Sequence, residues 1–225
     1  MKSFLFLLCS ICIFSLSNCS SSQNEVPQDS FAVSGTVKGL DSDFIRRSYK
    51  DKEDNWVVDS IPVENESFSY TAKIEEPAQI IIWPNIERTM KRSGGGYYPV
   101  KSGQFAFLAS PGDNITFSGE ITDFVDAYPS GTKANDDLAE INRKIFPMMN
   151  ESINLLLTKN GLEGDDLKEQ SLQDSMDKLD NEVLKAKKDF VKSNPDSEAA
   201  AWYLSDMMVR SQVTQDEAIA YFKGF

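Results

Sequence analysis

The sequence predicts an α+β fold, with an N-terminal antiparallel β-sandwich-like sheet followed by a helical C-terminal segment of three to four helices. In the first part, short runs of alternating apolar and polar residues are separated by turn residues, as in antiparallel strands. After Gly131 the apolar residues recur every three or four positions, which is the period of an α-helix. We therefore expect a β-rich domain over residues 31–130 and a helical segment over residues 131–225.

The first predicted strand covers residues 31–39, where Phe31, Val33 and Val37 alternate with smaller or polar residues. The further strand-like runs cover residues 44–49, 56–61, 67–74, 78–83, 103–109 and 114–118. Residues 111–114, Pro-Gly-Asp-Asn, have the clearest turn chemistry between these runs. Short strands at this spacing indicate an antiparallel sandwich or a barrel-like sheet.

A glycine run at residues 94–96 precedes Tyr97 and Tyr98. A phosphate-binding glycine loop leads into a helix N-terminus, and no helix start follows here. We therefore expect a mobile hairpin loop, and contact of its tyrosines with a ligand is the alternative. Together with Trp56 and Trp83, the two tyrosines would form a sugar-binding platform, although we expect both tryptophans to pack in the core of the sheet.

In the first predicted helix, Leu138, Ile141 and Ile145 share one face, and Pro147 is expected to kink or restart the helix. The best-patterned helix runs over residues 172–190, and its apolar face is expected to pack within the domain. The remaining helices are predicted over residues 197–209 and after residues 214–217, Thr-Gln-Asp-Glu, which form a capping box.

The N-terminus is typical of an exported, lipid-anchored protein. Lys2 precedes an apolar run over residues 4–16, which is too short for a bilayer span of about 20 residues. Residues 16–19, Leu-Ser-Asn-Cys, resemble the lipobox of bacterial lipoproteins. We therefore predict a signal peptide over residues 1–18, lipid attachment at Cys19 and a flexible tether over residues 19–30. The alternative is a soluble secreted protein, whose A-x-A-like cleavage site residues 16–18 do not match.

Composition removes several classes of chemistry. The chain has no histidine, which excludes Ser-His-Asp catalysis and His-ligated zinc. Cys9 and Cys12 have the C-x-x-C spacing but lie in the predicted signal, and Cys19 is expected to carry lipid, so no thiol remains for redox work. The net charge of -12 disfavours nucleic acid as a partner.

No acidic cluster in the sequence makes a convincing metal or catalytic site. Asp51, Glu53 and Asn55 have the spacing of the first ligands of a calcium loop, but Trp56 and Pro62 occupy positions that require glycine and glutamate. We expect a charged hairpin tip there. The pairs that a carboxylate hydrolase would use are Asp41 with Asp43, Asp136 with Asp137, and Asp165 with Asp166. We keep that enzyme only as an alternative, and we predict no catalytic residue, no cofactor and no metal.

Several short motifs, in order, resemble the N-terminal domain of unknown function that precedes a thioredoxin-like module in AhpC/TSA- and TlpA-type envelope lipoproteins of Gram-negative bacteria. The matching positions are a G-x-V-x-G opening at Gly35, Val37 and Gly39; a hairpin signature at Asp59, Ser60, Phe68 and Tyr70; a P-G-D-x-I turn at Pro111, Gly112, Asp113 and Ile115; a G-T-x-x-N step at Gly131, Thr132 and Asn135; and N-P-D-S at residues 194–197.

The resemblance implies an accessory domain seen without its enzyme, because the W-C-x-x-C module has no counterpart in these residues. We expect a lipid-anchored, non-catalytic accessory domain of a thiol-disulfide oxidoreductase lipoprotein, cut off before a thioredoxin-like domain or existing as a stand-alone relative. The alternative is a stand-alone envelope lipoprotein that binds a glycan or a peptide. The expected partners are the membrane, through the lipid, and a thioredoxin-like domain or another envelope protein. The expected location is the periplasmic side or the cell surface of the outer membrane.

Overall fold

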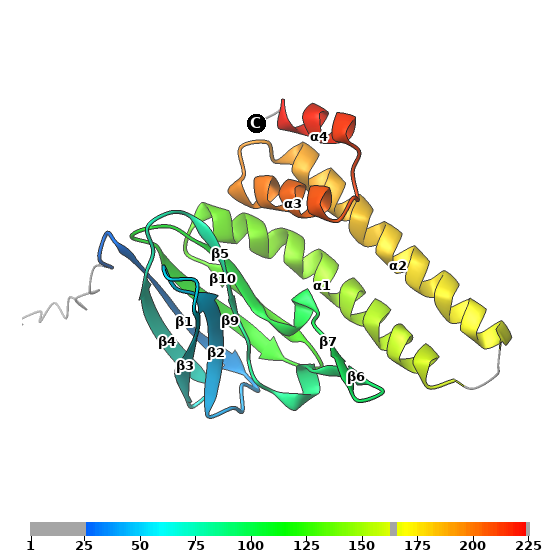
Figure 1. Ribbon diagram of the computed structural model, residues 1–225, viewed down its shortest axis with the longest axis horizontal. Helices are drawn as coiled ribbons and strands as arrows, with labels where there is room; N and C mark the ends of the chain where they lie inside the picture. Colours follow the sequence, from blue (N-terminus) through cyan, green and yellow to red (C-terminus); the bar gives the residue numbers. More distant parts are fainter. Residues whose placement is uncertain (1–25, 163–165, 224–225) are drawn as a thin grey trace, which may run out of the picture.

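The computed structural model describes residues 26–162 and 166–223. The predicted signal peptide, the lipid attachment at Cys19 and most of the predicted tether lie outside these residues. Within them the chain forms an N-terminal curled β-sheet structure followed by four helices, as predicted for the α+β class (Figure 1).

The strands are β1 (Ser30–Lys38), β2 (Phe44–Lys50), β3 (Trp56–Glu64), β4 (Ser67–Lys73), β5 (Ala78–Ile82), β6 (Lys91–Ser93), β7 (Gly96–Tyr98), β8 (Phe105–Ala109), β9 (Asn114–Ile121) and β10 (Val125–Ser130). Two short 3₁₀ helices, η1 (Glu87–Thr89) and η2 (Lys101–Gly103), flank the β6–β7 hairpin. The α-helices are α1 (Lys133–Asn160), α2 (Asp166–Ser193), α3 (Glu198–Val209) and α4 (Gln215–Phe222).

The largest sheet has six strands in the order β10-β9-β1-β4-β3-β2. Its pairs are antiparallel except for β1 and β9, which run parallel in the centre of the sheet. Strands β5 and β8 form a second, antiparallel sheet. One backbone bridge, between Arg46 of β2 and Trp83 after β5, joins the two sheets.

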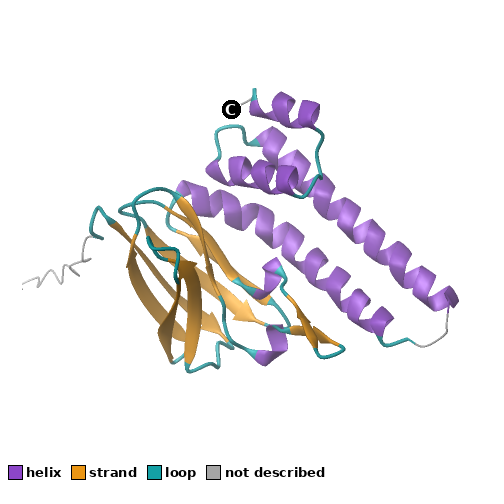
Figure 2. Cartoon of the chain, viewed as in Figure 1, coloured by secondary structure: helices purple, strands orange, loops and turns teal. Residues whose placement is uncertain are grey.

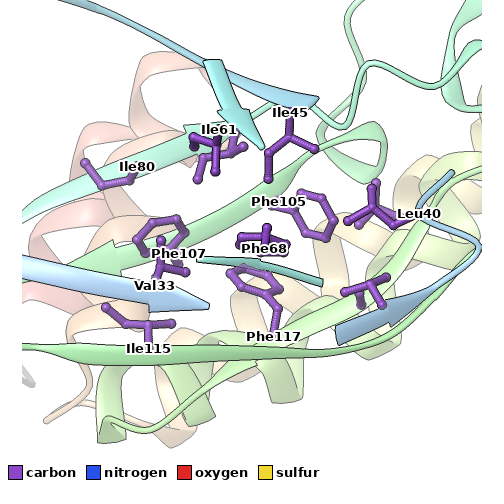
Figure 3. Packing of buried hydrophobic residues seen from close by; sticks show 14 of the residues in the cluster. Val33, Leu40, Ile45, Ile61, Phe68, Ile80, Phe105, Phe107, Ile115 and Phe117 are labelled. Carbon is purple, nitrogen blue, oxygen red and sulfur yellow. The ribbon is translucent and has the colours of Figure 1, made fainter. Parts of the chain in front are cut away.

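The core of the β-rich domain lies between these two sheets (Figure 3). Alternate residues of each strand point inward, so Phe105 and Phe107 of β8 meet Phe117 of β9, with ring centroids 5.2 Å and 5.8 Å apart. Gly35 of β1 leaves room for this packing, because a Cβ there would lie 2.8 Å from the ring of Phe68. The predicted alternation therefore produces one closed apolar layer.

Helix α1 lies against β10 and packs lengthwise along α2, while α3 and α4 cover one end of that helix pair (Figure 2). The α1 helix continues through Pro147 as one element, so the helix does not restart there. At the start of α4, Thr214 and Glu217 form the predicted capping box. No helix in the described part of the chain is long and apolar enough to cross a membrane.

Asn135 joins the helices to the second sheet. The Thr132 side chain caps α1 and accepts a hydrogen bond from the Asn135 backbone N–H. The fully buried Asn135 side chain accepts a bond of 3.0 Å from the Leu108 N–H and donates one of 2.8 Å to the Leu108 carbonyl. This amide therefore pairs with the outer edge of β8 as a neighbouring strand would.

Candidate ligand-binding site

A pocket of about 320 Å³ opens beside strand β2. The segment that follows β5, the β6–β7 hairpin and η2 form its other walls. Its lining residues are Arg46, Ser48, Trp83, Pro84, Asn85, Thr89, Met90, Arg92, Tyr97, Tyr98, Val100 and Gly103. The structure thus brings the predicted 94–98 loop together with one of the two tryptophans of the expected platform.

Trp83 and Tyr97 form an aromatic corner in this pocket. Their ring centroids are 6.0 Å apart and their planes meet at 60°, so the two rings present surfaces in different directions. Trp83 is partly buried, and Tyr97 is 43% exposed. Burial against its neighbours raises the pKa of the Tyr97 hydroxyl, which is therefore a neutral hydrogen-bonding group at physiological pH.

Trp56 does not join this corner, and the expectation that it packs in the core is wrong. It is 72% exposed on the outer face of β3. Side chains alternate along a strand, and Ile61 of β3 points into the core, so the even-numbered residues of β3 face outward. Only the ammonium of Lys50, 5.8 Å from the ring centroid, lies over the Trp56 ring among the described residues.

The hairpin that carries Tyr97 and Tyr98 is anchored on helix α1. Lys91 of β6, which is buried, donates to Asp123 at 3.1 Å and to Asn154 of α1 at 2.9 Å. At the other strand, the Tyr98 hydroxyl accepts a hydrogen bond of 3.2 Å from Asn160. The hairpin predicted from the glycine run is present, with Gly94 and Gly95 at positive φ in its turn, and its two strands are held in place.

Asp123 is the centre of the polar network under the hairpin. The same carboxylate oxygen accepts bonds from Asn150 at 2.8 Å, from Asn154 at 2.9 Å and from Lys91. Partial burial works to raise the pKa of this carboxyl, but these donors outweigh it and lower the pKa to about 2. The pocket wall therefore rests on a fully ionised acceptor.

Two arginines line the pocket, and they differ in their ion pairing. Arg92 is held by Glu87 through a two-point ion pair with distances of 2.8 Å and 3.2 Å. Arg46 makes no ion pair with a described carboxylate, and its guanidinium lies 4.8 Å from the Phe44 ring centroid. Asn85, at a φ of 58°, lies in the turn after β5 and lines the same pocket. The pocket therefore combines aromatic surface, one amide and one uncompensated positive charge.

Sequence reasoning missed Arg46, Asn85 and Arg92 as site residues. They come from three separate segments, and no spacing along the chain connects them. The only available signal was the joint presence of Trp83 and the two tyrosines.

Two residues of the hairpin signature, Asp59 and Tyr70, meet in a second hollow that is lined by strands β2, β3 and β4. The Tyr70 hydroxyl donates to Asp59 and accepts a bond of 3.0 Å from Arg47, whose guanidinium stacks 4.3 Å from the Tyr49 centroid. Burial and the Asp59 hydrogen bond raise the pKa of Tyr70 to about 12. The Tyr70 ring packs against the core, 6.1 Å from the Phe31 ring centroid, while Asp59 and Arg47 satisfy its hydroxyl.

The acidic groups considered from the sequence lie elsewhere. Asp51 accepts hydrogen bonds from the backbone N–H groups of Glu53 and Asn55, both at 2.9 Å, and so forms the expected hairpin tip. Asp41 pairs with Arg88.

Asp137 pairs with Lys133 in the first turn of α1. Asp165 falls outside the described residues. Within the described part of the chain, no group of three or more His, Cys, Asp or Glu residues could hold a metal ion.

Residues 31–138 match the family model described as Domain of unknown function (DUF4369). The comparison with curated proteins and the comparison with solved structures each gave no match. The matched segment begins in β1 and ends in the first turns of α1, so it includes the sheets, the pocket and the Asn135 contact. Residues 31–138 are therefore similar to this N-terminal domain of unknown function, DUF4369.

Proposed function

We propose that this chain is a non-catalytic, lipid-anchored binding protein of the bacterial cell envelope, and that the pocket beside β2 holds its ligand, a glycan or a peptide. The observation that carries the proposal is the aromatic corner of Trp83 and Tyr97 next to the unpaired guanidinium of Arg46. Aromatic faces stack on sugar rings and on apolar side chains, while a guanidinium and an amide fix orientation by hydrogen bonding.

The pocket is large enough to hold one group of a larger ligand. Its volume of about 320 Å³ is at the lower end of the range of ligand pockets, about 300–1,000 Å³. One sugar ring or one side chain fills such a space. The anchored hairpin supports the same proposal, because a preformed wall lowers the ordering cost of binding.

A panel of soluble glycans and peptides, titrated against the protein by calorimetry, tests the pocket. We expect Tyr97→Ala and Trp83→Ala to weaken any binding by about ten-fold or more, which corresponds to about 1.4 kcal/mol. Trp56→Ala is the matched control, because it removes the same ring type from an exposed position outside the pocket. A panel without a binder, or equal losses in Trp56→Ala and Trp83→Ala, would contradict the proposal.

The anchor is tested separately. The lipobox-like residues 16–19 support lipid at Cys19. We expect labelled palmitate to be incorporated into the protein in bacteria and to be lost in Cys19→Ala. A mass spectrum with an unmodified mature N-terminus would rule the anchor out.

A second candidate function is an accessory domain of a thioredoxin-like oxidoreductase. Its support is the ordered set of motifs together with the match over residues 31–138. Sequencing the gene beyond the codon for Phe225 tests it. An in-frame or frameshifted stretch encoding W-C-x-x-C would support a link to the oxidoreductase, and its absence would favour the stand-alone binding protein.

A further inference from the structure

We propose that the ligand of this pocket is a glycan that carries a carboxylate, as a uronic acid does, with one sugar ring on the aromatic corner and its carboxylate on Arg46. This inference rests on the proposed function, since it assumes that the pocket is a binding site. It adds the chemical class of the ligand and the residue that selects it.

Arg46 and Trp83 lie side by side at the pocket. The backbone N–H of Arg46 donates to the Trp83 carbonyl at 2.9 Å, and the Trp83 N–H donates to the Arg46 carbonyl at 2.7 Å. The two residues therefore form a directly opposed antiparallel pair, whose side chains lie on the same face with Cβ atoms about 5 Å apart. A sugar ring that contacts the indole is thus within reach of the guanidinium.

The same pairing leaves no open strand edge for a peptide at this point. The Arg46–Trp83 bridge is antiparallel and β5 contacts β2, so Ile81 of β5 lies alongside Ser48. An extended peptide would need free backbone groups on that edge for its main-chain hydrogen bonds. This wall of the pocket therefore offers side chains rather than backbone to a ligand, which favours a glycan over a peptide strand.

Arg46 is the cation of this pocket that is available to a ligand. The lining contains two arginines and, among the described residues, no aspartate or glutamate. Glu87 already neutralises Arg92 through two contacts of 2.8 Å and 3.2 Å, whereas Arg46 is exposed and forms no ion pair with a described carboxylate. One uncompensated guanidinium therefore remains at the pocket, in a chain with a net charge of -12.

A guanidinium selects a carboxylate by geometry as well as by charge. Its planar fork donates two parallel N–H bonds to the two oxygens of one carboxylate. A uronic acid carries such a carboxylate directly on the ring that stacks, whereas a neutral sugar leaves the guanidinium without a partner. The single unpaired arginine therefore matches one carboxylate on one sugar ring.

The other polar side chains of the pocket suit the hydroxyl groups of a sugar. Ser48, Asn85 and Tyr97 line the pocket and are exposed. Within the described part of the chain, none of these three side chains has a hydrogen-bond partner. A hydroxyl and an amide can each donate to and accept from a sugar hydroxyl. The pocket thus combines a stacking surface, one partner for a carboxylate and three partners for hydroxyls.

Matched sugars, titrated against the intact protein by calorimetry, test the inference. Trisaccharides of galacturonate and of glucuronate are each compared with their methyl esters, which keep the rings and remove the charge. A sulfated galactose trisaccharide shows whether any negative charge is sufficient. We expect at least one uronic acid to bind at least about ten-fold more tightly than its ester, because the ester cannot form the charge-assisted two-point contact. Salt at about 1 M should reduce this preference, since it shortens the Debye length to about 3 Å.

Two variants of strand β2 assign the preference to one residue. Arg46→Gln should remove the preference for the acid, because glutamine keeps a hydrogen-bonding group and loses the charge. Lys50→Gln is the matched control, since it removes one positive charge from the same strand at an exposed position outside the pocket. We expect Lys50→Gln to keep the preference for the acid.

The outcomes separate this inference from the proposed function. Equal affinities for acid and ester, a preference that survives in Arg46→Gln, or tighter binding of the sulfated sugar than of either uronic acid would overturn the carboxylate inference. A peptide that binds through Trp83, with no glycan bound, would leave the proposed function standing and also overturn the inference. If no glycan and no peptide binds, both fail.

Discussion

Replacing Asn135 by alanine should destabilise the fold far more than replacing an exposed asparagine by alanine would. The Asn135 side chain satisfies both backbone groups of Leu108 and also donates to the Thr132 hydroxyl at 2.8 Å. A buried polar group left without its partner costs about 1–3 kcal/mol. Two such groups therefore cost about 2–6 kcal/mol, and the better helix propensity of alanine offsets about 0.5 kcal/mol. We expect a net loss of about 1.5–5.5 kcal/mol in the free energy of unfolding.

Urea unfolding followed by circular dichroism measures this loss, and hydrogen exchange locates it. We expect the Leu108 amide of Asn135→Ala to exchange much faster than in the wild type, because its acceptor is gone. Asn181→Ala is the matched control, since Asn181 is exposed on α2 and the change there should slightly stabilise the helix.

Asn135→Asp separates the two bonds to Leu108. It keeps an acceptor for the Leu108 N–H but sets a second oxygen against the Leu108 carbonyl, so it should also destabilise. If Asn135→Ala unfolds within about 1 kcal/mol of the wild type, the view that this amide substitutes for a strand is refuted.

Three further predictions follow from the same structure. Gly119→Ala should destabilise by several kcal/mol, because Gly119 has a φ of 143° and a Cβ would lie 2.2 Å from the Asp126 carbonyl oxygen; Gly161→Ala, at an ordinary helical φ, is its control in urea unfolding. The lowered pKa of Asp123 means that its contribution to stability is present above pH 3.8 and lost as the pH falls toward 2, so the stability difference between wild type and Asp123→Asn should shrink over that range. Burial lowers the pKa of Lys101 from 10.5 to about 8 despite its ion pair with Asp206, so the unfolded chain binds more protons than the folded chain between these pH values. The free energy of unfolding of the wild type should therefore rise from about pH 8 to pH 10.5 relative to that of Lys101→Met. Parallel curves of the free energy of unfolding against pH for the two proteins would contradict this.

The alternation of residues was enough to predict most strands and all four helices, because each pattern reflects one buried face. Strand β10 was missed because Pro129 lies in it, and proline within a run argues against a strand. The structure accommodates Pro129 because β10 is an edge strand, where a missing N–H costs little. Pro147 was expected to interrupt α1, but packing of α1 on β10 and α2 outweighs the loss of one helical bond.

What the sequence did not predict depends on contacts between distant segments. The outward direction of Trp56 depends on which face of β3 meets the core, and the residue type alone does not fix that choice. The pocket is assembled from Arg46, Asn85 and the β6–β7 hairpin, which approach one another only when Trp83, after β5, pairs with Arg46 of β2. The hairpin was predicted, but the buried Lys91 that fixes it on α1 was not, because a lysine is most often exposed.

The parallel pairing of β1 with β9 has a consequence for how the domain is made. Val33 of β1 lies opposite Ile115 of β9. The β1–β9 pairing therefore cannot form until a segment roughly eighty residues further along the chain has been synthesised. Until that segment arrives, β1 has only β4 beside it, and the nascent domain exposes a hydrophobic edge to whatever chaperone accompanies it. We expect such a topology to fold slowly and in one step. A chain that ends near Asn114, before β9, should therefore form no native-like intermediate.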